Sequence, residues 1–403
     1  MITLKTRLLA INAFILLSFA ATAHAEDAAM DWLNITNGAV LISATSQYDS
    51  GSNSGIAAIS GNNRFTWYTA ENDGGPQTLI YELAQRVMIE RFVIDTSYEA
   101  NSRAPKSGTL WGSEVSAAGP WKVIRNFEVD SGAGRNVFSV TGELFASRWL
   151  KFEIKSNWGS PQYTAITEFE AYGEQVGTIE HDTDLSGAFN SNYEKMWLLM
   201  DGTDVVGCYD WQNGTLTGDT DGRLFRFQWT EKPPQIGSAI MAISSDGSVF
   251  GGMFFEQGEV QGIWSGSRLT GGSKPNCQPK TNSVEDALNE NNRAVLYGIH
   301  FDFDSAKLRS SAAPTLKLLK QALDSNPGWA VEIQGHTDSD GTDKYNLDLS
   351  DRRAASVLAW LASNGIEQSR LTSKGFGESV PASDNSSSQG RALNRRVEIV
   401  RAQ

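Results

Sequence analysis

The sequence predicts a multidomain protein with an N-terminal β-sandwich, a β-rich middle segment and a C-terminal α+β domain of order β-α-β-α-β-β. Three observations support this fold class. The chain has 403 residues, which is more than one domain usually holds. Short strand-like runs separated by Gly, Ser and Asn fill the region before residue 277, a pattern typical of sandwiches. After residue 293, strand-like runs alternate with helical periodicity, which indicates helices packed on a sheet.

Residues 1–25 have the features of a secretory signal peptide. Lys5 and Arg7 precede an apolar run from Leu8 to Ala23, and the small residues up to Ala25 form an A-x-A cleavage site. An uncleaved membrane anchor is the alternative, but the apolar run is short for one. Because no cysteine follows the cleavage site, a lipid anchor is disfavoured. We therefore expect an exported protein.

The composition is acidic, with a formal net charge of −13, and loss of Lys5 and Arg7 makes the mature chain more negative by two. This charge argues against a nucleic-acid partner, which needs a basic face. The only cysteines, Cys208 and Cys277, are expected to form a disulfide in an exported protein; two buried free thiols are the alternative. Two isolated cysteines and few histidines disfavour a zinc site, and no metal or cofactor is expected.

Residues 26–175 contain the runs that predict the β-sandwich. The clearest are Gln77–Asp95, Trp121–Val129, Arg148–Ser156 and Ala165–Gly173. Within the third run, Leu150–Lys155 alternates apolar and polar residues, which is the mark of a half-buried strand.

Three stretches of this region, Trp67–Thr69, Ser107–Ile124 and Arg148–Gly173, resemble the discoidin or coagulation-factor type C family, which has a galactose-binding-like jelly roll. The matching positions are mostly core positions, so the resemblance implies the fold, and no binding residue is transferred. Such domains often bind glycans, and an exposed aromatic ring in a strand-end loop would be the sugar platform. The candidates, each with a core position as its expected role, are Trp67, Tyr68, Trp111 and Trp158.

Residues 176–277 are expected to form a β-meander, either as a separate small domain or as an extension of the sandwich. Asp219–Gly222 and Ser245–Gly247 are hairpin-turn signals, and Arg223–Trp229 alternates like a strand. The acids near these turns lack the spacing of a calcium loop, so turn formation is the expected role. Residues 278–293 have the polar composition of a linker.

Residues 294–403 are expected to form the α+β domain. The helix at Ser350–Gly365 has the clearest pattern, with Ser350 as N-cap and Gly365 as C-terminal stop. The other expected elements are a helix at Ala312–Ser325 and strands at Ala294–Phe303, Trp329–Thr337, Leu371–Glu378 and Asn394–Ala402.

Asp338 and Arg353 are the main candidate site residues in this domain. Asp338 ends a strand, and Arg353 is expected in the first turn of the next helix, where backbone N–H groups add anion affinity. A carboxylate and a guanidinium facing one pocket would complement a ligand end with an ammonium and a carboxylate. The alternative is that the two side chains pair with each other. A calcium loop starting at Asp338 fails because Leu349 occupies the place of the required Glu, and no catalytic nucleophile accompanies His336.

The C-terminal region strongly resembles the OmpA-like peptidoglycan-binding domain. The matching segments are Phe301–Leu308, Gly335–Ile366, Arg370–Asn385 and Gly390–Ile399. The resemblance implies that Asp338 and Arg353 hold the diaminopimelate of the uncrosslinked stem peptide. It also implies that Thr337, Asn346, Leu349 and Arg396 support the pocket, that Phe303 and Asp304 form its rim, and that His336 is structural.

These observations predict an exported cell-envelope protein of the periplasm or outer membrane that binds peptidoglycan and is not an enzyme. Its N-terminal jelly roll would present a surface for a glycan or an envelope protein. Two alternatives remain. One is an outer-membrane β-barrel, porin-like, with a periplasmic peptidoglycan anchor, although Val87–Asp95 and the Gly- and Ser-rich loops do not keep the alternation expected of such a barrel. The other is a cell-wall glycan hydrolase with its site in the middle segment.

Overall fold

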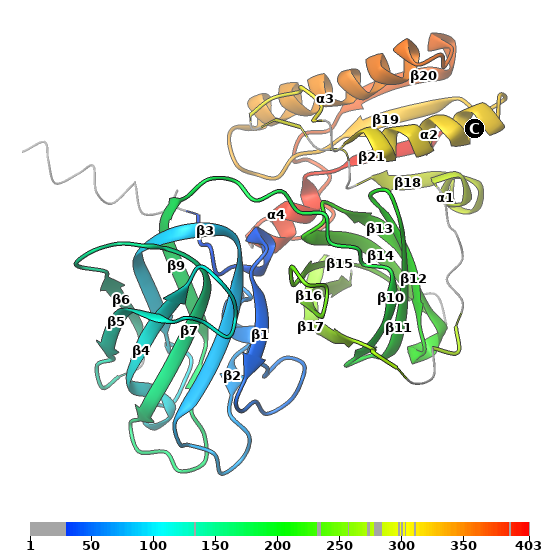
Figure 1. Cartoon of the computed structure of the whole chain (residues 1–403). Coiled ribbons are helices and arrows are strands. Elements are labelled where there is room, and N and C mark those ends of the chain that lie inside the picture. Colours follow the sequence, from blue (N-terminus) through cyan, green and yellow to red (C-terminus); the bar gives the residue numbers. More distant parts are fainter. Residues whose placement is uncertain are drawn as a thin grey trace, which may run out of the picture.

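The computed structural model describes residues 30–402 except 133, 232–234, 257, 272–274, 278–283, 297, 298, 300, 303, 310, 311 and 387. The expected signal peptide and Phe303 therefore lie outside the described residues. The chain folds into a β-sandwich, a closed barrel and an α+β domain, in that order (Figure 1). No helix in the described part of the chain is long and apolar enough to cross a membrane.

The N-terminal part is the predicted β-sandwich. Its long strand β3 pairs with β1 and β7 through its first residues and with β6 and β9 through its last, across a register shift between Glu82 and Val87. Phe152 of β7 and Phe169 of β9 stack with 3.7 Å between ring centroids, so the two groups of strands face each other across one core. The strands are β1 (Val40–Ala44), β2 (Trp67–Tyr68), β3 (Gln77–Asp95), β4 (Pro105–Ser113), β5 (Lys122–Glu128), β6 (Arg135–Ser139), β7 (Ala146–Asn157), β8 (Ala165–Ile166) and β9 (Glu168–Gln175).

The middle segment is a closed eight-stranded antiparallel barrel, in which each strand pairs with the next and β10 pairs with β17. Alternate side chains fill its interior, including Phe189, Phe225, Phe227 and Trp264. The strands are β10 (Gly187–Ser191), β11 (Glu194–Asp201), β12 (Asp204–Tyr209), β13 (Gly214–Thr220), β14 (Leu224–Glu231), β15 (Gln235–Ile243), β16 (Val249–Glu256) and β17 (Glu259–Arg268).

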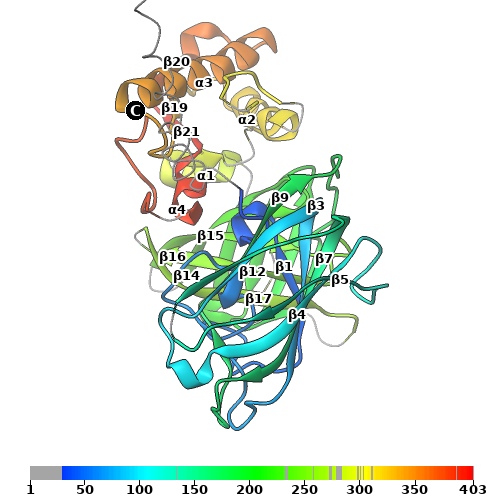
Figure 2. The same cartoon turned by 90° about the vertical axis from the view of Figure 1, so that its left-hand side faces the viewer.

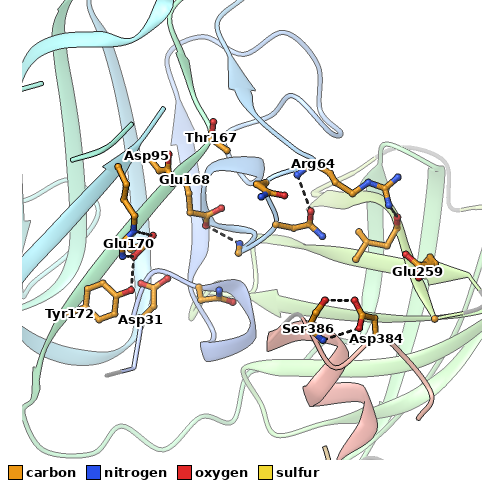
Figure 3. Close-up of a pocket in the computed structure, with 17 residues that line it drawn as sticks. Asp31, Arg64, Asp95, Thr167, Glu168, Glu170, Tyr172, Glu259, Asp384 and Ser386 are labelled. Carbon is orange, nitrogen blue, oxygen red and sulfur yellow. Dashed lines mark hydrogen bonds and ion pairs between the residues drawn. The ribbon is translucent and has the colours of Figure 1, made fainter. Parts of the chain in front are cut away.

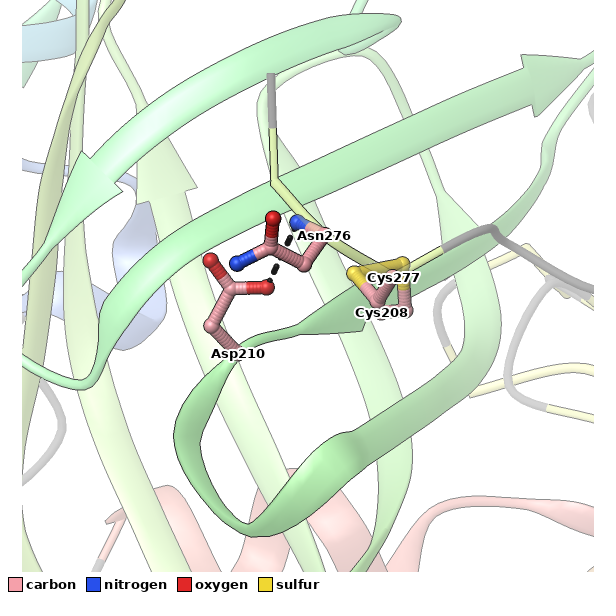
Figure 4. Close-up of a disulfide and its surroundings, with 4 residues drawn as sticks. All are labelled: Cys208, Asp210, Asn276 and Cys277. Atoms are coloured by element: carbon pink, nitrogen blue, oxygen red, sulfur yellow. Dashed lines mark hydrogen bonds between the residues drawn. A yellow bond between two sulfur atoms is a disulfide. The ribbon is translucent and has the colours of Figure 1, made fainter. Parts of the chain in front are cut away.

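The sequence correctly predicted the meander and its hairpin turns, but not the closure of the barrel. Gly222 and Gly247 have positive φ angles of 85° and 68°, which explains a glycine in each turn. The disulfide between Cys208 and Cys277 joins β12 to the chain beyond β17, with 5.9 Å between Cα atoms (Figure 4). Beside it, Asp210 accepts a hydrogen bond from the backbone N–H of Asn276 at 2.8 Å.

The C-terminal part is an α+β domain with a four-stranded sheet of order β18-β21-β19-β20. Helices α2 and α3 pack on the sheet around one apolar core (Figure 1). The structure adds two helices that the sequence analysis did not anticipate, of which α1 occupies the expected linker. The elements are α1 (Val284–Asn291), β18 (Arg293–Leu296), α2 (Ala313–Ser325), β19 (Val331–Gly335), α3 (Asp343–Ser363), β20 (Leu371–Gly375), α4 (Ser388–Asn394) and β21 (Val397–Arg401).

The sandwich and the barrel share one apolar core, because outward-facing barrel residues such as Ile240 and Met253 pack with the sandwich residues. Strand β1 lies against β16 (Figure 1), and a Cβ on Gly251 would come within 2.6 Å of Ile56. In the turned view, the helices of the C-terminal domain lie above the barrel and the sandwich (Figure 2). The barrel also contacts the C-terminal domain: Ser383 donates a hydrogen bond to the carbonyl of Gly258 at 2.7 Å. The outer face of the barrel therefore borders both neighbouring domains.

Candidate functional site

Asp338 lies in the loop after β19, at the strand end where the sequence places it. The residue is buried, with 7% of its surface exposed. Its Oδ1 accepts a hydrogen bond from the backbone N–H of Asp340 at 3.2 Å, and its Oδ2 lies 2.5 Å from Nη1 of Arg395. An ionised carboxylate has about four acceptor positions, so these two contacts leave acceptor capacity for a ligand.

Arg353 lies ten residues after the start of α3 rather than in its first turn. The helix begins at Asp343, and its N-cap is Thr342, whose side chain accepts a hydrogen bond from the backbone N–H of Tyr345. The prediction that Ser350 caps this helix is therefore wrong. The backbone N–H groups of the helix start are too distant to assist Arg353, because the unsatisfied donors lie within the first turn.

Ser350 is instead a buried contact between α3 and the sheet. Its hydroxyl accepts a hydrogen bond from the backbone N–H of Gly377 at 2.8 Å. A Cβ on Gly335 would lie 2.2 Å from the carbonyl oxygen of Ser350, and one on Gly375 would lie 2.4 Å from the backbone nitrogen of Asp351. The two glycines thus let α3 lie close against β19 and β20. This close packing determines where Arg353 stands relative to the end of β19.

The guanidinium of Arg353 is half-buried and only partly bonded. Its Nε donates to the carbonyl of Ser305 at 3.0 Å, and its Cζ lies 5.1 Å from the centre of the Phe301 ring. Neither Nη atom has a hydrogen-bond partner among the described residues. Burial lowers the pKa of Arg353, while the nearby charge of Asp338 opposes this shift. Asp338 forms its ion pair with Arg395 and not with Arg353, so the alternative of mutual pairing does not hold.

Beside Arg353 lies a cavity of about 160 Å³ between the C-terminal domain and the barrel. We call it the arginine pocket, because five arginines line it together with His336 and a few apolar side chains. Four of the five belong to the C-terminal domain, and the fifth, Arg226, belongs to β14 of the barrel. The five are Arg226, Arg309, Arg353, Arg395 and Arg396.

Three of the predicted supporting residues lie around Asp338. Asn346 is fully buried in α3, and its side-chain amide donates to the carbonyl of Asp338 at 3.1 Å. Thr337 is buried, and its backbone N–H donates to the carbonyl of Gly377 at 3.0 Å. Leu349 is buried on the same helix as Asn346. Asn346 and Thr337 thus fix the loop that carries the carboxylate.

The remaining predicted residues differ in their positions. Arg396 is buried, donates from Nε to Glu398 at 2.6 Å, and lines the arginine pocket. Asp304 is exposed and has a left-handed φ of 52°. Its negative charge acts to raise the pKa of Arg353. Phe303 lies outside the described residues. Arg226 was missed because nothing in the sequence indicates that the middle segment borders this site.

His336 lies in the core of the domain, stacked on Phe376 with 5.3 Å between ring centroids. Burial is the largest cause that lowers the pKa of His336 to about 3, with smaller contributions from the positive charges of Arg396 and Arg293. The ring is therefore neutral at physiological pH and adds no charge to the arginine pocket.

A second cavity of about 630 Å³ lies where the sandwich, the barrel and the loop before α4 meet (Figure 3). Its walls are rich in carboxylates, including Asp31, Glu168 and Glu170 from the sandwich and Asp384 from the loop. Burial raises the pKa of Asp31 to about 7 and the pKa of Glu168 well above its usual range. These residues come from distant parts of the chain, so no local motif announces the cavity. Within the described residues, no group of three or more His, Cys, Asp or Glu could hold a metal ion.

Of the aromatic candidates in the sandwich, Trp67 is fully buried, and its indole N–H donates to the carbonyl of Ser46 at 3.0 Å. Tyr68 belongs instead to a group of rings that we call the tyrosine patch: Tyr48, Tyr68 and Tyr163. The ring centroid of Tyr163 lies 6.2 Å from that of Tyr48 and 6.0 Å from that of Tyr68. Tyr48 is 56% exposed. The Arg103 guanidinium lies 5.5 Å from the Tyr163 ring centre.

Trp111 and Trp158 are half-buried outside this patch. The indole N–H of Trp111 donates to Glu153 at 3.0 Å, and that of Trp158 donates to the carbonyl of Val129 at 3.2 Å. Both rings thus have fixed partners within the sandwich.

Two family models match the chain. Residues 300–395 match the OmpA family, and residues 61–175 match the Sad1/UNC-like C-terminal model. The peptidoglycan-associated lipoprotein of Pseudomonas aeruginosa is 34% identical over 140 residues, which are 34% of this chain and 82% of that protein. The chain belongs to the OmpA family.

Other relatives match over a smaller share of their length. Outer membrane porin F of Pseudomonas aeruginosa is 43% identical over 105 residues, which are 26% of this chain and 30% of that protein. Porin F of Pseudomonas fluorescens is 44% identical over 100 residues and 31% of its length. The chain thus spans about a third of these two relatives.

Among solved structures, the peptidoglycan-associated lipoprotein of Burkholderia pseudomallei is 33% identical, with 26% of this chain and 88% of that chain covered and a TM-score of 0.24. The CpGH89CBM32-5 module of Clostridium perfringens, solved with GalNAc-β-1,3-galactose, is 18% identical. The match covers 34% of this chain and 96% of that chain, with a TM-score of 0.30.

Proposed function

We propose that this protein is a non-enzymatic component of the cell envelope that binds peptidoglycan through its C-terminal domain. In this proposal, Asp338 and Arg353 hold the diaminopimelate of an uncrosslinked stem peptide. The supporting observation is that a buried carboxylate and a half-buried guanidinium lie close enough to interact electrostatically without forming an ion pair with each other. The OmpA-family relatives include outer-membrane and peptidoglycan-associated proteins, which supports a location in the periplasm or at the outer membrane.

The free end of diaminopimelate is an amino acid, with one ammonium and one carboxylate. Its ammonium would donate hydrogen bonds to Asp338, which accepts but cannot donate. Its carboxylate would bind both Nη atoms of Arg353, which have no other hydrogen-bond partner in the described part of the chain. Asn346 would keep the loop in place, because its amide is bonded to the Asp338 carbonyl. Binding of this kind breaks no covalent bond, so no catalytic residue is required.

Co-sedimentation of the mature chain with purified sacculi tests this function. We expect Asp338→Asn and Arg353→Gln to reduce the pelleted fraction strongly, since removal of one partner of a desolvated charge pair costs about 2–5 kcal/mol in binding. Free diaminopimelate should compete with sacculi for the wild-type protein. If both variants pellet like wild type, the assignment of these two residues is wrong.

Arg352→Gln is a matched control for Arg353→Gln. Arg352 precedes Arg353 in the same helix, is exposed, and pairs with Asp348 at 2.8 Å. The control removes the same charge from the surface next to the site, and we expect it to leave binding nearly unchanged. A similar loss of sacculus binding in both variants would indicate general electrostatic attraction instead of specific binding by Arg353.

We also propose a glycan contact for the sandwich, and the tyrosine patch is the observation that favours it. Exposed aromatic rings beside an arginine can stack on the apolar face of a sugar and hydrogen-bond its hydroxyls. The double substitution Tyr48→Ala and Tyr163→Ala should abolish retention on an immobilised glycan array while leaving sacculus binding through Asp338 unchanged. Unchanged array binding would exclude the patch as the contact.

A further inference from the structure

Of the five arginines that line the arginine pocket, the proposed diaminopimelate contact uses only Arg353. None of its lining residues within the described chain is an Asp or Glu. Three of its arginines have an acidic partner: Arg395 with Asp338, Arg396 with Glu398, and Arg309 with Asp302 at 3.4 Å. Arg226 has a longer pair with Asp221 at 3.9 Å, and Arg353 has no ion pair with a described residue.

Arg226 reaches the pocket because of its position in the barrel. On β14, Phe225 and Phe227 point into the barrel interior, so Arg226 between them points outward. Its side chain is only 14% exposed and pairs with Asp221 at 3.9 Å, while the buried Asp219 of β13 stands opposite it in the strand register. The atom Nη1 is buried without a hydrogen-bond partner.

The long pair with Asp221 compensates this guanidinium only in part, because a buried N–H group without a hydrogen-bond acceptor loses its hydration. The neighbouring cations Arg353 and Arg395 increase the cost by repulsion. An anionic group in the pocket would supply the missing hydrogen-bond acceptor and reduce the repulsion. The positive charge of the lining therefore favours a negatively charged ligand.

The size of the pocket limits what this ligand can be. A water molecule needs only about 10–15 Å³ of such space, so a cavity of about 160 Å³ has room for a small anionic group. A carboxylate with its neighbouring carbons fits this volume.

We propose that Arg226 completes an anion subsite next to the Asp338–Arg353 pair, and that this subsite takes a second carboxylate of the same stem peptide. This inference rests on the proposed function. In the stem peptide, the residue before diaminopimelate is a γ-linked glutamyl residue whose α-carboxylate is free. With diaminopimelate held at Asp338 and Arg353, this carboxylate is the first anionic group towards the N-terminal end of the peptide. The barrel thereby becomes part of the wall-binding site.

Isothermal titration of the mature chain with two synthetic tripeptides tests the subsite. One is L-Ala-γ-D-Glu-diaminopimelate, and the other carries an amide in place of the glutamyl α-carboxylate. We expect wild type to bind the acid form about tenfold or more tightly than the amide, as is typical for a charge-assisted hydrogen bond. Arg226→Gln should bring the two affinities close together without weakening binding of the amide. Arg226→Lys, which keeps the charge, should retain part of the preference.

The outcomes separate this inference from the proposed function. Asp338→Asn should weaken both peptides equally, and Arg352→Gln should leave their ratio unchanged. If wild type prefers the acid form and Arg226→Gln does so equally, or if wild type shows no preference, the subsite is wrong while the proposed function stands. If wild type binds neither peptide, the proposed function fails first. A thermal unfolding curve for each variant establishes that the variant is folded.

Discussion

Arg223 of the barrel forms a buried ion pair with Glu82 of the sandwich, with 3.2 Å between Nη1 and Oε1. Arg223 also donates hydrogen bonds to the carbonyls of Gly38 at 2.7 Å and Glu82 at 3.0 Å. A second arginine, Arg148, lies 2.9 Å from the same carboxylate oxygen. Together with the shared apolar core, this network joins the sandwich and the barrel into one unit.

Substitution of Glu82 should destabilise that unit strongly. We expect Glu82→Gln to lower the free energy of unfolding by about 3–5 kcal/mol, because it leaves two buried guanidinium groups without their counter-charge. Chemical denaturation of the mature chain measures this loss. The matched control is Glu114→Gln, which breaks the exposed pair with Arg86 at 3.6 Å and should cost less than about 1 kcal/mol. Equal losses in the two variants would contradict the role given to Glu82.

Asp31 should make the sandwich less stable as the pH rises. Its pKa in the folded protein is about 7, compared with an ordinary value of 3.8, so the folded state holds a proton that the unfolded state releases. Its stabilising contribution is therefore complete below pH 3.8 and is lost as the pH rises through 7. Asp31→Asn keeps the oxygen that accepts from Leu33 and Ala171. We therefore expect the melting temperature of Asp31→Asn to exceed that of wild type by a larger margin at pH 8 than at pH 4. An equal margin at the two pH values would refute this role of Asp31.

His336 should have the opposite effect in the C-terminal domain. Its pKa falls from 6.5 to about 3 on folding, so the unfolded state binds a proton that the folded state excludes. The stability that this neutral ring provides is complete above pH 6.5 and is lost as the pH falls towards 3. His336→Phe can keep the stacking on Phe376 but cannot titrate. Hydrogen exchange in β19 should therefore accelerate between pH 6.5 and 4 in wild type more than in the variant, after correction for intrinsic rates.

The disulfide should stabilise the barrel. Cys208 and Cys277 are 69 residues apart, and a cross-link over such a loop is worth about 2–4 kcal/mol through restriction of the unfolded chain. We expect the double substitution Cys208→Ala and Cys277→Ala to lower the unfolding midpoint. Reducing agent should lower the midpoint of wild type by the same amount and leave the variant unchanged. A variant as stable as oxidised wild type would contradict this role.

Local patterns predicted much of the C-terminal domain correctly, but they misplaced the start of α3. Ser350 has the chemistry of an N-cap, yet Thr342 performs that role, because Ser350 is needed as a small residue against Gly335 and Gly375. Both threonine and serine are good caps, so only tertiary packing distinguishes them. Arg353 stays a predicted site residue, since its place relative to Asp338 depends on the helix face more than on the helix start.

Short-range periodicity and turn chemistry encode the three-part β, β and α+β organisation and the turns of the middle segment, so local patterns predicted these features, while Asp338 and Arg353 stay predicted ligands. Tertiary packing alone pairs β10 with β17, brings Arg223 to Glu82 of the sandwich, and places Arg226 in the pocket that Arg353 also lines. Each of these contacts joins residues far apart in the chain. Their formation depends on which surfaces pack together, and no local pattern in the sequence records that choice.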